Sequence, residues 1–210
     1  MNARYVKFVI TAVFAVVLLF VAHVAAERMA SAGQRSEQFA PVVHDVNYFR
    51  VIFAIVVTFV LLAPAFCLYV LQGREGPSDT WRNLYTFAYV AYVIHLYWAI
   101  FGIMGGDWSL IFKNPRLVMT PWFDVPVTIW WTLDLPLVWI AARNIPWIRI
   151  ERGLLQIALA LGFIGSATTK GDAGMATLGY LTAVAILASI VARLVIYRSE
   201  ERRVGKECLE

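Results

Sequence analysis

The chain has 210 residues, of which 60% are hydrophobic and 15% are charged, and its formal net charge is +4. A soluble domain typically has about 45–50% apolar and about 25% charged residues, so this composition excludes an ordinary water-soluble protein. The basic residues are scattered among apolar runs. That pattern argues against nucleic-acid binding and favours basic loops beside a lipid bilayer.

Six apolar segments are long enough, or nearly so, to cross a bilayer as helices, which takes about 20 residues each. Their apolar runs are continuous, whereas the strands of a membrane barrel alternate between apolar and polar residues. We therefore predict an all-α, polytopic integral membrane protein in which residues 1–197 form a single transmembrane helical bundle. In chain order the segments are Phe8–Ala26, Val51–Gln72, Leu84–Met104, Phe123–Ala142, Gly153–Thr169 and Met175–Tyr197.

The first segment has two interpretations. Arg4 and Lys7 precede it, and residues 24–26, which read VAA before Glu27, resemble a signal-peptidase site. Retention gives six transmembrane helices, and cleavage gives five. In both cases the N-terminus starts in the cytoplasm, and the distribution of lysine and arginine over the loops agrees with that orientation. We predict a multi-pass protein of the bacterial cytoplasmic (inner) membrane.

Residues 198–208 read RSEERRVGKEC and resemble the translation of a sequencing adapter. We therefore predict that residues 198–210 are a non-native tail, and no functional argument rests on them. The alternative is a solvated basic tail that closes the last helix.

The last two segments carry small residues spaced four apart, which let helix backbones approach closely. The short KGDAG turn between them, residues 170–174, predicts an antiparallel hairpin. The small residues are Ala158, Gly162 and Ser166 on one segment and Gly179 and Ala183 on the other.

The centre of the fourth segment holds an aspartate, Asp134, in the stretch WWTLDLPLV. An aspartate at the centre of a membrane helix costs about 2.5–3.5 kcal/mol on insertion scales, so it normally faces the bundle interior and finds a partner. His95 lies near the middle of the preceding segment, which is an antiparallel neighbour. We predict that His95 and Asp134 form a buried polar pair, directly or through a water molecule, either as an ion pair or as a neutral hydrogen-bonded pair.

Aromatic residues surround this predicted pair. Three tyrosines precede His95 at spacings of four, three and three, which places them on the same helical face. Two tryptophans share the face of Asp134 on the next segment. A phenol stripe that ends at an imidazole favours a protein interior or a cavity over lipid. The candidate pocket-lining residues are Tyr85, Tyr89, Tyr92, Trp130 and Trp131.

The outer loops form a second candidate region. His44 and Asp45 lie shortly before the second segment, and Asp107 and Asp124 flank a loop with tryptophans and basic residues. Such a loop predicts an interfacial or re-entrant element, which serves either as a substrate entrance or as an ordinary anchored connection.

Three functions remain open at this stage. The first is a non-enzymatic membrane protein, either a subunit of a larger complex or a small carrier, with the His95–Asp134 pair as its polar centre. The second is a membrane enzyme that acts on a lipid-soluble, isoprenoid or quinone-like substrate. The third is a b-type haem protein. The pair could also serve only to fix helix register.

The sequence does not decide whether the protein is an enzyme, and no cofactor and no metal site is predicted, because no ligand spacing typical of zinc or haem is present. The expected partners are the lipid bilayer and either other membrane subunits or a lipid-soluble small molecule. Nucleic acid is not expected.

Overall fold

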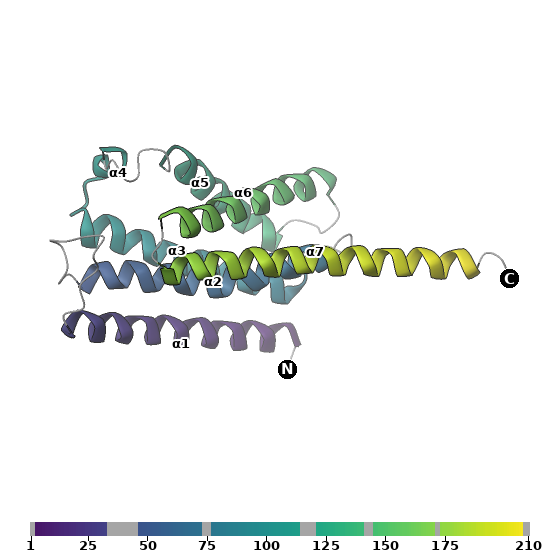
Figure 1. Ribbon diagram of the computed structural model, residues 1–210, viewed down its shortest axis with the longest axis horizontal. Coiled ribbons are helices and arrows are strands. Elements are labelled where there is room, and N and C mark those ends of the chain that lie inside the picture. Colours follow the sequence, from purple (N-terminus) through teal and green to yellow (C-terminus); the bar gives the residue numbers. More distant parts are fainter. Residues whose placement is uncertain are drawn as a thin grey trace.

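The computed structural model describes residues 3–32, 46–72, 77–113, 121–140, 145–170 and 173–207, and every regular element within these ranges is a helix. The predicted all-α class is therefore confirmed. Figure 1 shows the helices in chain order. They are α1 (Ala3–Ser31), α2 (Val46–Gln72), α3 (Asp79–Tyr97), the π-helix η3 (Trp98–Ile103), α4 (Ser109–Lys113), α5 (Pro121–Ile140), α6 (Pro146–Lys170) and α7 (Ala173–Glu207).

Five helices of the described chain, α1, α2, α3 with η3, α6 and α7, are long and apolar enough to cross a membrane. A multi-pass membrane protein is therefore confirmed. The fourth predicted segment forms α5, which is 20 residues long but is not among the five. Its aspartates, Asp124 and Asp134, and its internal prolines lower its mean hydropathy. The number of these helices equals the number predicted for a cleaved first segment, but the helices are not the same. The five in the structure include α1 and leave out α5, whereas cleavage would remove the first segment and keep the fourth.

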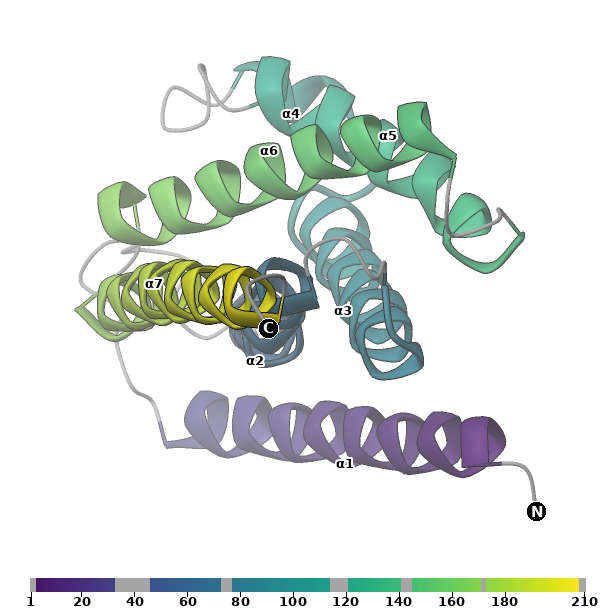
Figure 2. The ribbon, with the colours of Figure 1, turned by 90° about the vertical axis from the view of Figure 1, so that its right-hand side faces the viewer.

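The centre of the bundle is α2. It contacts α1, α3, α6 and α7. Figure 2 looks nearly along α2 and α7, and α2 lies between α1 on one side and α6 on the other. Leu61, Leu62 and Ala65 of α2 have at most 1% of their surface exposed. A helix whose middle is almost entirely apolar is expected at such a position, because it can be covered by neighbours on most of its faces.

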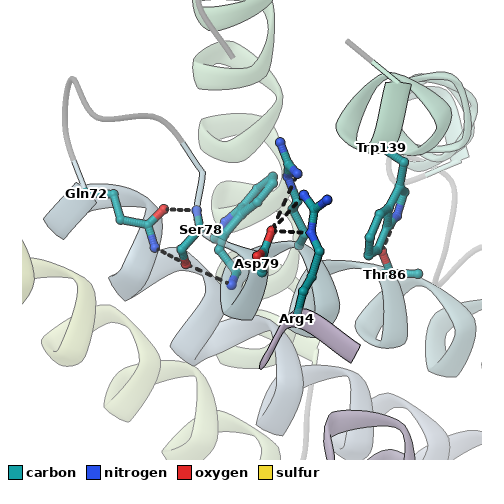
Figure 3. A network of polar contacts seen from close by, with 8 residues as sticks. Arg4, Gln72, Ser78, Asp79, Thr86 and Trp139 are labelled. Carbon is teal, nitrogen blue, oxygen red and sulfur yellow. Dashed lines mark hydrogen bonds and ion pairs between the residues drawn. The ribbon is translucent and has the colours of Figure 1, made fainter. Parts of the chain in front are cut away.

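Ion pairs join both ends of α1 to the neighbouring helices. Near its start, Arg4 forms an ion pair with Asp79 of α3, with Nη2 and Oδ1 3.0 Å apart (Figure 3). Near its end, Glu27 forms an ion pair with Arg50 of α2. Between them, α1 buries only small alanines, among them the fully buried Ala26. Cleavage after the VAA sequence stays untested, but α1 is part of the bundle in this structure.

The start of α3 is fixed by a side-chain cap. The Ser78 hydroxyl accepts a hydrogen bond from the Trp81 backbone N–H at 3.2 Å, which satisfies one of the free donors at the helix start. Gln72, at the end of α2, donates to the same hydroxyl at 2.7 Å and accepts from the Ser78 N–H at 2.8 Å (Figure 3). The side chains thereby tie the end of α2 to the start of α3.

The contact between α6 and α7 depends on a glycine. A Cβ at Gly179 would lie 3.0 Å from both the Ala167 Cβ and the Thr168 Cγ2 of α6. The prediction that Gly179 allows close approach therefore agrees with this packing. Gly162 has a different role, because a Cβ there would lie 2.9 Å from the Phe123 ring of α5. Residues 198–207 continue α7 as a helix, and their predicted non-native origin stays a prediction.

We expect Gly179→Val to lower the free energy of unfolding by about 1–3 kcal/mol, because the added methyl groups overfill the contact between α6 and α7. The measurement is reversible unfolding of the purified protein in detergent micelles. Gly165→Val is the matched control, since nothing lies within 4 Å of a Cβ at Gly165. Equal losses in the two variants would show that the α6–α7 contact does not depend on the glycine.

Candidate functional site

The carboxylate of Asp134 is bound by side chains from two other helices. Arg152 of α6 approaches Asp134 Oδ1 with Nη2 at 3.0 Å and Nε at 3.2 Å. The Tyr85 hydroxyl of α3 donates to Asp134 Oδ2 at 3.1 Å. Asp134 and Tyr85 are fully buried, and Arg152 is 6% exposed. We call these three residues the Asp134 site. It joins α3, α5 and α6 at a single point.

The chemistry of the Asp134 site explains how a charge is tolerated there. The planar guanidinium presents several donors in a fixed geometry that matches a carboxylate, and the pair carries no net charge. A pair of this kind avoids the cost of one isolated ion in lipid, which is several kcal/mol. The Tyr85 hydroxyl supplies a further donor to the carboxylate, whose two oxygens both have partners.

The predicted pairing of His95 with Asp134 is wrong as a direct contact. His95 Nδ1 instead lies 2.9 Å from the Val51 carbonyl oxygen of α2, and its ring stacks on Tyr92 with centroids 5.9 Å apart. The reason is depth. His95 lies ten residues beyond Tyr85 on α3, which corresponds to about 15 Å along the helix axis. Asp134 lies level with Tyr85, so His95 contacts another layer of the bundle.

Sequence reasoning missed Arg152, because it placed this residue in a loop. The predicted segment began at Gly153, whereas α6 begins at Pro146. Arg152 therefore lies in the second turn of the helix and not before it. Asp134 lies six residues before the end of α5, and Arg152 lies six residues after the start of α6. In an antiparallel pair these positions have the same depth, and this register would have identified the partner.

Tyrosine hydroxyls continue the contact between α3 and α5 away from the Asp134 site. Tyr89 lies 2.8 Å from the Thr132 hydroxyl, and Tyr92 lies 2.9 Å from the Thr128 hydroxyl. Each threonine hydroxyl donates its own proton to a backbone carbonyl four residues earlier in α5. The two tyrosines must therefore be the donors. The predicted tyrosine face of α3 thus lies against α5.

The aromatic rings form a continuous cluster around Tyr85. Trp81 stacks on Tyr85 with centroids 4.7 Å apart and an interplanar angle of 17°. Trp131 lies against the rings of both Tyr85 and Tyr92, at 5.5 Å from each. The Arg152 guanidinium lies 5.7 Å from the centre of the Trp81 ring, within the range of a cation–π contact. Tyr85 and Trp131, two of the candidate pocket-lining residues, therefore lie close to Asp134.

Trp130 has a different environment from Trp131. Its Nε1–H donates to Glu151 Oε1 of α6, while Glu151 Oε2 is buried and has no hydrogen-bond partner. Trp130 is only partly buried. It therefore joins α5 to α6 next to Arg152, on the neighbouring face of α5.

Gln156 and Trp131 are among the described residues near the Asp134 site that have buried polar atoms without protein partners. Gln156 is 5% exposed, and neither its amide nitrogen nor its amide oxygen makes a hydrogen bond. Trp131 is fully buried, and its Nε1–H makes none. Gln156 lies one turn from Arg152, and Trp131 lies one turn from Asp134, both on the side away from the α5–α6 connection. We call Gln156 and Trp131 the amide–indole layer.

The outer candidate residues are dispersed. His44 and Asp45 lie outside the described residues. Asp107 lies just before α4 and is exposed, and hydrogen bonds from the side chain and backbone of Ser109 lower the pKa of its carboxyl. Asp124 lies in the first turn of α5. A role for these four residues in substrate entry stays a prediction.

Within the described ranges, no group of three or more His, Cys, Asp or Glu side chains could hold a metal ion. The haem alternative is not tested by this geometry. Comparisons with family models, curated proteins and solved structures found no match for the chain. The Asp134 site and the amide–indole layer are therefore the features of this chain that bear on its function.

We expect Asp134→Leu and Arg152→Met each to lower the free energy of unfolding by about 3–5 kcal/mol, because each leaves a buried charge without its partner. The double variant should recover most of this loss, since it removes both charges. Reversible unfolding in detergent micelles, analysed as a double-mutant cycle, measures the coupling.

The control for this cycle is Arg4→Met, which removes an ion pair whose arginine side chain is 53% exposed. An exposed pair typically contributes about 0.2–1 kcal/mol, so this variant should lose little stability. Additive losses in the double variant would contradict a coupled pair at the Asp134 site.

Proposed function

We propose that this protein is a small, non-enzymatic carrier that holds a lipid-soluble molecule between α3, α5 and α6 within the membrane. The observation that carries the proposal is the amide–indole layer. Buried polar groups in proteins almost always have hydrogen-bond partners, and an exception calls for an explanation such as a ligand. Gln156 and Trp131 are such exceptions, and they lie one turn from a buried ion pair.

The ion pair supports a binding role over a catalytic one. Both oxygens of Asp134 already accept hydrogen bonds from Arg152 and Tyr85. A general acid or base must be within hydrogen-bond reach of the substrate proton that it moves. The Asp134 carboxylate is instead occupied by its own chain. The amide of Gln156 and the indole of Trp131 can bind and orient a ligand but do not transfer protons, and the neighbouring Glu151 carboxylate already accepts a hydrogen bond from Trp130.

The proposed location is the bacterial cytoplasmic membrane, with the N-terminus in the cytoplasm. This orientation requires the starts of α1 and α3 and the end of α5 to lie on the same side. The contact of Arg4 with Asp79 and the hydrogen bond from Trp139 to Thr86 at 3.1 Å support that arrangement (Figure 3). The basic residues at this end then face the cytoplasm, as the positive-inside rule expects.

The test is extraction of the purified protein. The full chain is purified in a mild detergent, extracted with organic solvent and analysed by mass spectrometry. We expect a lipid-soluble compound in near-stoichiometric amount, and about tenfold less of it in Gln156→Leu, the loss that corresponds to one hydrogen bond. Thr182→Val is the control, because it changes a buried polar residue of α7 whose hydroxyl bonds only its own helix.

Two outcomes would contradict the carrier. One is a wild-type protein with no bound compound that co-purifies stoichiometrically with another membrane protein, which would favour the subunit of a complex. The other is a bound compound retained equally by Gln156→Leu, which would place the binding site elsewhere in the chain.

A further inference from the structure

The chemical class of the bound molecule can be argued from the same residues, and this step rests on the proposed function. The first consideration is charge. Asp134 and Arg152 cancel each other, and their ion pair is buried at 0% and 6% exposure. An anion or a cation bound one turn away would bring a charge without a counter-charge to a lipid-like depth, where isolated charges are strongly disfavoured. The site therefore fits a neutral molecule.

The second consideration is the balance of donors and acceptors. An indole nitrogen can only donate, and an amide nitrogen carries two donors. The N–H of Trp131 and the NH₂ of Gln156 thus offer donors with no acceptor in the protein, and the N–H of Trp81, whose ring also packs on Tyr85, adds another. The Gln156 oxygen is the one acceptor without a partner in the amide–indole layer. A molecule that complements this set presents oxygen acceptors, such as carbonyl groups.

The third consideration is depth and shape. Gln156 lies ten residues from the start of α6, which is about 15 Å along the axis and close to half of the hydrocarbon thickness of about 30 Å. Such a position suits a ligand that arrives through the bilayer. The rings of Tyr92 and Phe163 lie 5.5 Å and 6.1 Å from Trp131. Aromatic rings pack favourably against a flat, conjugated ring.

We infer that the bound molecule is a neutral, lipid-soluble compound with conjugated ring carbonyls, the chemistry of a quinone. The carbonyl oxygen accepts hydrogen bonds from Gln156 and Trp131, and the ring lies among the aromatic side chains. The ion pair holds α5 and α6 in the register that places Gln156 and Trp131 at similar depth.

The experiment compares two probes of similar size, of which only the first has carbonyl groups. The first is a benzoquinone with a decyl tail, and the second is the dimethyl ether of its hydroquinone. A ligand that binds the folded state raises its thermal stability. We expect the quinone to raise the Tm of the full chain in detergent by a few degrees and the ether to leave it unchanged. Gln156→Leu should abolish the shift.

Two further variants keep the test decisive. Trp131→Phe keeps an aromatic ring but removes the N–H, so it should weaken the quinone shift even if Gln156→Leu folds poorly. Trp122→Phe, on the same helix but 75% exposed, should keep the full shift. Equal shifts with quinone and ether, or a full shift in Gln156→Leu, would overturn the inference.

The two proposals fail in distinguishable ways. A co-purified compound without a carbonyl group would overturn the quinone-like class and leave the carrier in place. No co-purified compound together with no quinone shift would overturn both. A Gln156→Leu variant that simply gains thermal stability, with no ligand effect in the wild type, would mark Gln156 as a buried amide without a binding role.

Discussion

The structure depends on the charge of Asp134, which has no exposed surface. A carboxylate at this depth requires a partner, and the partner must come from a neighbouring helix at the same level of the bundle. Arg152 meets that requirement, and Tyr85 adds a donor from a third helix. Because hydrogen-bond geometry tolerates only small displacements, these contacts fix the relative heights of α3, α5 and α6.

The fixed register has a consequence for α5. Its contact with α3 is formed by long side chains, with the Tyr89 and Tyr92 hydroxyls donating to threonines. The threonine hydroxyls cannot donate to the tyrosines, because each already donates its only proton to a backbone carbonyl of α5. The tyrosine hydroxyls of α3 therefore donate to α5, whereas Trp139 of α5 donates to the Thr86 hydroxyl of α3.

The sequence was sufficient for the class of fold and for the polar character of the interior. Long apolar runs predict membrane helices, and the spacing of Tyr85, Tyr89 and Tyr92 predicts one face. The partner of Asp134 was not predicted correctly. The prediction assumed that His95 and Asp134 both lie at the middle of their segments and therefore at the same depth. Depth is counted from helix ends, and α6 begins seven residues before the predicted segment, so the charged residues Glu151 and Arg152 are part of the helix. Hydropathy locates the ends of such helices poorly, because charged residues near a helix end lower the mean hydropathy of that part of the sequence.

A buried ion pair explains register, but it does not explain Gln156. A leucine at that position would fill a similar volume without leaving an amide unbonded, and a buried amide without partners costs about 1–3 kcal/mol. The same reasoning does not apply to Trp131, whose ring packs against Tyr85 and Tyr92 and would be retained for its area alone. Gln156 is therefore the residue that separates a merely structural polar centre from a binding site, since its cost is offset only when something accepts and donates hydrogen bonds there.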